Sequence, residues 1–138
     1  MSELLANRIK TPDGTILQSY NRHDYKTHTD AVTGETYMVD GGLAYMRRSM
    51  NNVPATEMSV YDDAPHAEIR EAFCWGTRGR DGYEPVQYKP VKDLTSDHIA
   101  AILKTQHQIP DVIRKVFVDE LKFRGEYTWQ FFDQLESI

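Results

Sequence analysis

Residues 24–46 constrain the fold more than any other stretch of the chain. Two runs rich in Tyr, Thr, Val and Met flank residues 30–34, Asp-Ala-Val-Thr-Gly, which have the composition of a hairpin loop. Gly41 and Gly42 follow the second run and allow the chain to leave a sheet at backbone angles that a Cβ would resist. The stretch therefore predicts a β-hairpin at the centre of the N-terminal half, with which earlier strands can pair.

Two shorter strands are predicted before this hairpin. Residues 1–6 are expected to be a lead-in, and residues 7–10 and 15–20 to be strands joined by Thr-Pro-Asp-Gly at 11–14. Proline presets the first turn angle and glycine accepts a positive φ, so this join is a turn. With the hairpin, these strands predict a four-stranded meander. Residues 43–50 could then form a fifth strand or a helical turn.

The C-terminal half has the periodicity of helices around a second hairpin. Asp62, Asp63 and Pro65 have the composition of a helix start. Residues 74–77 and 85–88 are predicted to pair, and Thr95 or Ser96 to cap a helix. The predicted helices cover residues 65–73, 96–107, 110–124 and 126–136. We therefore expect an α+β fold in a single domain over residues 1–138, mainly strands over 7–61 and mixed over 62–138, with C-terminal helices covering an N-terminal antiparallel sheet.

Composition limits the classes of function. The chain of 138 residues carries a net charge of −5, which argues against nonspecific nucleic-acid binding because that needs a net basic face. The single Cys74 is consistent with a reducing compartment such as the cytosol. No apolar run approaches the roughly 20 residues of a membrane span, and no signal peptide opens the chain, so no membrane partner is expected.

Histidine and aspartate residues near the central hairpin form the first candidate site. In an extended strand Asp24, His28 and Asp30 share one face, while His23 points to the other. Such residues can act as an acid–base pair, ligate a metal, bind a ligand, or satisfy turn and cross-strand hydrogen bonds. Their spacing matches no zinc signature. We expect neither a metal nor a cofactor.

Residues 75–83 form the second candidate site. Arg78 and Arg80 offer guanidinium groups that pair with phosphate oxygens, and the glycines between them let backbone N–H groups approach an anion. Trp75 and Tyr83 offer rings on which a base can stack. The loop lacks the Gly-Lys-Ser/Thr ending of a Walker A motif. An ordinary solvated hairpin loop, with Trp75 in the core, is the alternative.

Further basic residues could border a pocket or a subunit contact. Arg47 and Arg48 are adjacent in the N-terminal half, and Arg114 lies beside the apolar stripe of a predicted helix. Charges of this kind also commonly decorate a solvated face. The aromatic segment 127–132 is explained by core packing or by an oligomer interface.

Four segments carry a resemblance to a known family: residues 7–17, 22–25, 37–43 and 75–77. Together they resemble a family of small, mostly uncharacterised proteins of tailed bacteriophages, over roughly residues 7–124. The resemblance implies expression in the cytoplasm of an infected bacterium and an accessory role against host defence. In size and order of elements the chain is also similar to the phage anti-Thoeris proteins, oligomers that sequester cyclic ADP-ribose-type signals with aromatic and arginine side chains. No site residue is carried over from them.

These observations favour a noncatalytic sponge that binds a small phosphorylated, often cyclic, nucleotide immune signal and acts as a homo-oligomer. The expected ligand-binding residues are Arg47, Arg48, Trp75, Arg78, Arg80, Tyr83, Arg114, His23 and His28. Two alternatives remain open. One is a phosphodiesterase or other hydrolase that uses His23 or His28 with Asp24 and Asp30. The other is an inhibitor that binds a host protein.

Overall fold

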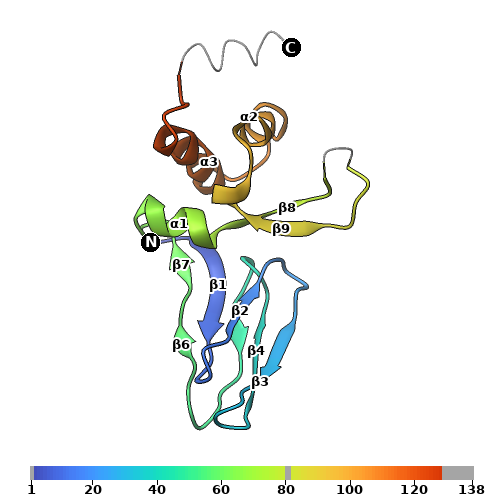
Figure 1. The fold of residues 1–138 in the computed structure, drawn as a ribbon, viewed down its shortest axis with the longest axis vertical. Helices are drawn as coiled ribbons and strands as arrows, with labels where there is room; N and C mark the ends of the chain where they lie inside the picture. Colours follow the sequence, from blue (N-terminus) through green and yellow to red (C-terminus); the bar gives the residue numbers. More distant parts are fainter. Residues whose placement is uncertain (1, 80–81, 129–138) are drawn as a thin grey trace. The chain divides into compact units, whose positions relative to one another are not determined.

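The computed structural model describes residues 2–79 and 82–128. Contacts along the chain gather into two compact units, an N-terminal unit of residues 1–63 and a C-terminal unit of residues 64–138 (Figure 1). The first contains antiparallel strands and the second contains the α-helices, so the predicted α+β class is confirmed. The prediction that the helices cover the N-terminal sheet concerns the placement of one unit on the other, and it stays a prediction.

The strands of the N-terminal unit form two antiparallel sheets. In one, β1 (Leu4–Lys10) pairs with β2 (Ile16–Ser19) on one side and with β6 (Thr56–Glu57) and β7 (Val60–Tyr61) on the other. The other has the order β3 (Lys26–Thr29), β4 (Thr36–Asp40), β5 (Arg47–Arg48). The predicted single meander is therefore wrong, because β2 and β3 belong to different sheets and β1 takes its second partners from β6 and β7, some fifty residues along the chain. The lead-in is also shorter than predicted, since Leu5 and Ala6 are buried in β1.

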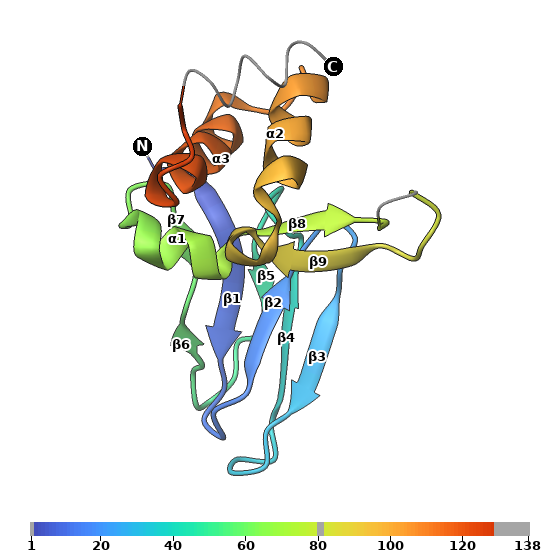
Figure 2. The same ribbon diagram turned by 45° about the horizontal axis from the view of Figure 1, so that its top comes forward.

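The predicted central hairpin is confirmed. Strands β3 and β4 pair in register from Lys26 opposite Val39 to Thr29 opposite Thr36 (Figure 2). On β4, Tyr37 and Val39 are buried and pack in one apolar cluster with residues of the other sheet. The alternation read from the sequence thus places the apolar face of this hairpin in the core of the N-terminal unit.

The two glycines after β4 turn the chain at a crowded point. Gly41 and Gly42 have φ of +99° and +53°, and the carbonyl of Gly41 accepts hydrogen bonds from the N–H groups of Ala44 and Tyr45. A Cβ on Gly42 would lie 2.4 Å from the carbonyl carbon of Asn21. Residues 43–50, for which the sequence left strand and helical turn open, therefore contain a turn followed by the two-residue strand β5.

The C-terminal unit contains α1 (His66–Ala72), the hairpin of β8 (Cys74–Thr77) and β9 (Gln87–Pro90), the 3₁₀ turn η1 (Val91–Asp93), α2 (Ser96–Thr105) and α3 (Asp111–Phe123). These helices and the second hairpin were predicted. Thr95 caps α2, and its hydroxyl accepts the N–H of His98. The predicted cap of α1 is wrong: Asp62 and Asp63 instead accept hydrogen bonds from Glu3 N and Ser2 Oγ.

Helix α3 ends in a glycine cap. Gly125 has φ of +73°, its N–H bonds the carbonyl of Lys122, and the N–H of Glu126 bonds the carbonyl of Leu121, which is a Schellman motif. The predicted helix over 126–136 is wrong at its start, because residues 126–128 follow this cap in irregular conformation. The rest of that prediction, and most of the aromatic segment 127–132, lies outside the described residues.

The core of the C-terminal unit combines aromatic contacts with a buried ion network. Phe117 of α3 meets the rings of Phe73 and Trp75 edge-on. Glu120 of α3 is fully buried and bonds to Arg70 of α1 and to Arg124. No helix within residues 2–79 and 82–128 is long and apolar enough to cross a membrane.

Candidate functional site

A cleft of about 720 Å³ lies in the C-terminal unit, between the β8–β9 hairpin and the start of α2. This volume falls within the range of small-molecule sites. The hairpin contributes Thr77, Gly79, Glu84, Gln87 and Lys89. The segment from η1 into α2 contributes Asp93, Leu94, Thr95, Asp97, His98 and Ala101.

The register of the hairpin fixes which side chains face the cleft. Trp75 pairs with Lys89 and Thr77 pairs with Gln87, and partners across an antiparallel pair project to the same face. At the base of this face, Trp75 packs edge-on against Phe117, with ring centroids 5.2 Å apart. The Trp75 indole therefore packs the hairpin against α3, while Thr77, Gln87 and Lys89 on the same face line the cleft.

Glycine places a carboxylate at the hairpin side of the cleft. Gly79 has φ of +79°, and a Cβ there would lie 2.1 Å from an oxygen of Glu84. The N–H of Glu84 also bonds the carbonyl of Arg78, which closes the loop. Glycine at 79 is therefore favoured by the backbone angle, whereas the exposed side chain of Glu84 is flexible and can move to admit a Cβ.

The charges of the cleft are mixed and predominantly negative. Three carboxylates, those of Glu84, Asp93 and Asp97, line it together with the ammonium of Lys89 and the imidazole of His98. Leu94, which is almost fully buried, supplies an apolar patch. This arrangement offers acceptors to ligand amines and hydroxyls, and a smaller set of donors to an anionic group.

The structure brings only part of the predicted loop site to this cleft. Thr77 and Gly79 line it, whereas Arg78 is exposed and Tyr83 is 92 % exposed, and neither belongs to the lining. Arg80 lies outside the described residues. Trp75, for which stacking and core packing were both open, packs against Phe117.

Lys89, Gln87 and His98 are cleft residues that the sequence analysis missed. Gln87 belonged to the strand predicted over 85–88, whereas Lys89 lay beyond its end, because the strand observed is β9 (Gln87–Pro90). In the observed register Gln87 pairs with Thr77 and Lys89 with Trp75, so both residues lie on one face of the hairpin. His98 lies in the first turn of the helix predicted over 96–107, so the sequence already placed it close to Thr95 and Asp97.

Three predicted arginines have partners within the fold. Arg48 bonds Asn7 Oδ1 at 3.0 Å and Ser59 Oγ at 2.6 Å, and it pairs with Glu57. Arg47 pairs with Asp40 at 3.1 Å. Arg114 donates to the carbonyls of Leu103 and Gln106 at the C-terminal end of α2.

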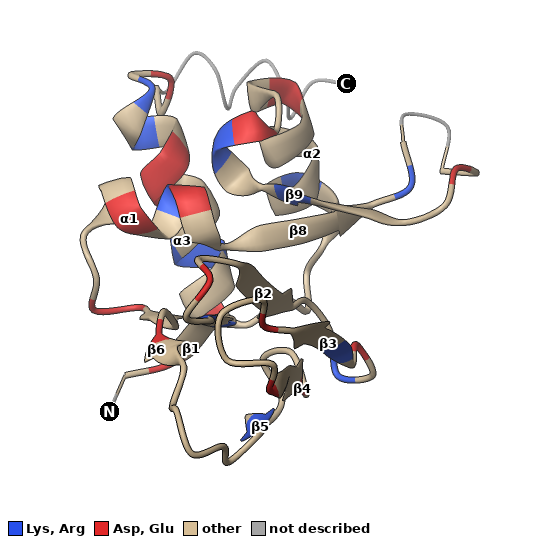
Figure 3. Cartoon of the chain, turned by 60° about the horizontal axis from the view of Figure 1, so that its bottom comes forward, with Lys and Arg blue, Asp and Glu red and all other residues tan. Residues whose placement is uncertain are grey.

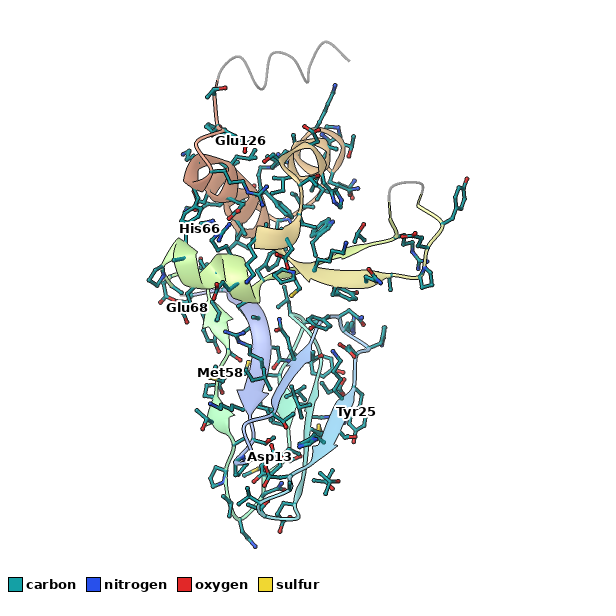
Figure 4. The ribbon with its side chains drawn as sticks, viewed as in Figure 1. Asp13, Tyr25, Met58, His66, Glu68 and Glu126 are labelled. Carbon is teal, nitrogen blue, oxygen red and sulfur yellow. The ribbon has the colours of Figure 1, made fainter. Side chains whose placement is uncertain are left out.

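The cluster around His28 contains different residues from those that the sequence analysis predicted. His28 Nε2 lies 2.8 Å from Asp13 Oδ2, and Asp30 Oδ1 accepts the N–H of Asp13 at 2.7 Å. Asp13, in the turn that follows β1, is labelled in Figure 4. Asp24 lies apart: it accepts the N–H of Tyr20 and pairs with Lys26. His23 is exposed, and its N–H bonds Asn21. The missed member, Asp13, sits in the predicted turn at 11–14.

Hydrogen bonds keep both carboxylates of this cluster ionised. The N–H of Ala31, the hydroxyl of Thr11 and the imidazole of His28 hold the pKa of Asp13 well below its usual range. Burial raises the pKa of Asp30, but the N–H groups of Thr33 and Asp13 outweigh that effect and lower it. Two negative charges are therefore present beside one imidazole at neutral pH.

No protein-family model, curated protein or solved structure matches the chain. The resemblance to tailed-phage proteins therefore stays a prediction, and the functional argument depends on the geometry of the chain itself.

Proposed function

We propose that the chain is a noncatalytic binding protein that holds a small nucleotide of low phosphate charge, such as a cyclic nucleotide, in the cleft of the C-terminal unit. The observation that carries the proposal is the cleft itself, about 720 Å³ in volume and lined by hydrogen-bonding side chains from β8, β9 and α2. In the setting that the phage resemblance implies, the ligand is an immune signal and its sequestration is the activity.

The charges of the cleft select the kind of nucleotide. Lys89 and His98 can donate to one phosphodiester, whereas Glu84 and Asp93 can accept from the exocyclic amine of a base or the hydroxyls of a ribose. Because the three carboxylates would repel a polyphosphate, the cleft favours a ligand with one or two negative charges over a nucleoside triphosphate.

The lining residues favour binding over hydrolysis. A hydrolase needs an activated nucleophile or a metal-bound water beside a general base. His98 is a candidate base, but the lining residues include no Ser or Cys, and the Thr95 hydroxyl accepts the backbone N–H of His98 as the cap of α2. We therefore expect the protein to release its ligand without having cleaved it.

Calorimetric titration with a panel of cyclic mononucleotides, cyclic ADP-ribose, adenosine and ATP tests the proposal. At least one cyclic nucleotide should bind at micromolar concentration, more tightly than ATP, and chromatography of the heated complex should return it unchanged. The variant Lys89→Met should weaken binding by about 10-fold or more, since a hydrogen bond to a charged group contributes about 1.5–3 kcal/mol.

The matched control is Lys10→Met, which removes an exposed lysine from β1 of the N-terminal unit. It should bind like the wild-type chain. Equal loss in both variants, or no binding by any panel member at millimolar concentration, would contradict the proposal. Recovery of a cleaved nucleotide would instead establish the hydrolase that the sequence left open.

A further inference from the structure

Three side chains of metal-ligating types converge within the N-terminal unit, whereas the proposed nucleotide cleft belongs to the C-terminal unit. They come from separate segments: Asp13 from the turn after β1, His28 from β3, and Asp30 from the loop of the central hairpin. One ligand atom of each lies within 4.8 Å of the others. We propose that Asp13, His28 and Asp30 bind a divalent transition-metal ion.

The spacing is close to that of a metal site. At metal–ligand bonds of about 2.0–2.2 Å, two ligand atoms of one ion lie about 3.0–4.4 Å apart. The ligand atoms of the cluster lie within 4.8 Å of one another, and the 2.8 Å between His28 Nε2 and Asp13 Oδ2 must widen by a few tenths of an ångström for both atoms to bind one ion. The side-chain torsion of His28, which is partly exposed, can supply that adjustment.

The backbone holds both carboxylates in place before any ion arrives. Asp13 Oδ2 accepts the N–H of Ala31, and Asp30 Oδ2 accepts the N–H groups of Val32 and Thr33. Bonds of this kind orient ligands in known metal sites. Asp30 Oδ1 accepts the N–H of Asp13, and a carboxylate oxygen has a second lone pair for an ion.

Charge gives an independent reason for a cation at this point. Asp30 is 1 % exposed and the Asp13 side chain only 12 %, so solvent screens their repulsion poorly. A single proton on His28 offsets one of the two negative charges, whereas a divalent ion offsets both. The ion takes the place of the hydrogen between His28 Nε2 and Asp13 Oδ2. When that hydrogen is present, binding releases it as a proton or shifts it to the other ring nitrogen.

The donor set identifies the class of ion. One imidazole nitrogen with two carboxylates suits first-row ions such as Zn²⁺, Co²⁺ and Mn²⁺ better than Ca²⁺, which takes six to eight oxygens. Three protein ligands leave a coordination position for water.

Titration of the EDTA-treated full-length chain with Co²⁺ and Zn²⁺ tests the site. Visible absorption of Co²⁺ reports coordination by the protein, and calorimetry reports the affinity for Zn²⁺. Wild-type protein should bind one equivalent of each at micromolar concentration. His28→Gln should weaken binding at least 10-fold, because it removes the nitrogen ligand. His23→Gln is the matched control and should bind like wild type, since His23 is exposed outside the cluster.

A second measurement on wild-type protein does not depend on the folding of a variant. Mn²⁺ added at substoichiometric amounts should broaden the imidazole resonances of His28 and leave those of His23 sharp. Equal broadening of both, unchanged affinity in His28→Gln, or no binding of Co²⁺ and Zn²⁺ at millimolar concentration would overturn the proposal.

Discussion

Neighbouring residues with the same side chain can have different roles in this fold. Arg47 and Arg48 are the same amino acid at adjacent positions. They lie on β5, where successive side chains project to opposite faces. The Arg47 side chain is 62 % exposed, whereas that of Arg48 is 19 % exposed and joins Asn7, Ser59 and Glu57. A guanidinium engaged in this way stabilises the contact of β5 with the first sheet and is a poor candidate for a ligand.

Replacing Gly42 with alanine should destabilise the N-terminal unit strongly. Gly42 has φ of +53°, and the added Cβ would lie 2.4 Å from the backbone of Asn21. A positive φ costs a residue with a Cβ about 1 kcal/mol, and forced repacking adds about 1–3 kcal/mol. Urea unfolding should therefore show a loss of about 2–4 kcal/mol.

The control for this substitution is Gly34→Ala. Gly34 also has a positive φ, +72°, but no atom lies within 4 Å of the position that its Cβ would take. This variant should lose only about 1 kcal/mol. Equal losses in the two variants would show that the backbone angle alone, and not the approach of Asn21, determines the requirement for glycine at 42.

At the scale of elements, local signals were sufficient for helices and hairpins but not for the sheets. The turn at 11–14, the loop at 30–34 and the cap at Thr95 act over a few residues, so composition reveals them. The pairing of β1 with β6 and β7 joins segments some fifty residues apart, and nothing in two-residue strands encodes their partner. The order of strands therefore could not be obtained from the sequence alone.

The candidate sites show the same division between local and long-range signals. Sequence analysis found the glycine-rich hairpin loop, of which Thr77 and Gly79 line the cleft. It paired His28 with Asp24 and Asp30 because they share a strand, whereas the side chain that bonds His28 is Asp13, from a different turn. Composition identified the residue types, but only the folded chain determines which of them meet.

Helices α1 and α3 are joined through Glu120, and this contact should make stability depend on acid. Burial raises the pKa of Glu120, but hydrogen bonds from Arg70, Arg124 and His66 outweigh that effect and lower it from the usual 4.5 to about 2. The unfolded chain therefore binds the proton more readily than the folded chain. The contribution of Glu120 is complete above about pH 4.5, and it disappears as the pH falls towards 2. Its size is on the order of 3 kcal/mol.

Urea unfolding of Glu120→Gln and wild type at several pH values checks this contribution. At pH 7 the variant should be less stable by about 3–5 kcal/mol, because the partly buried Arg70 and Arg124 lose their fully buried ion partner. The difference should shrink as the pH approaches 2. Glu68→Gln is the control, an exposed glutamate in the first turn of α1, and it should change stability little. A difference that stays constant with pH would mean that Glu120 contributes by shape and not by charge.

At the scale of the whole molecule, the net charge and its distribution bear on whether the chain binds polyanions such as nucleic acids nonspecifically. The chain carries 16 Lys and Arg against 21 Asp and Glu. Basic and acidic residues both occur on α2, α3 and the β8–β9 hairpin (Figure 3). Several basic side chains are paired, among them Arg70 and Arg124 with Glu120 and Lys115 with Asp119. Among the residues that the structure describes, these pairs offset positive charge of the kind from which nonspecific nucleic-acid binding derives its affinity.

We therefore expect no binding to a random DNA duplex of about 20 base pairs at about 150 mM salt, up to about 100 µM protein, in fluorescence anisotropy. If the proposed function holds, the same preparation should bind a cyclic nucleotide under these conditions, because contacts inside a cleft are screened less by salt than contacts on an open surface. Binding to the duplex that falls steeply with added salt would reveal a basic surface on the molecule. The affinity for nucleotides would then belong to that surface, and the Lys89→Met variant would retain it.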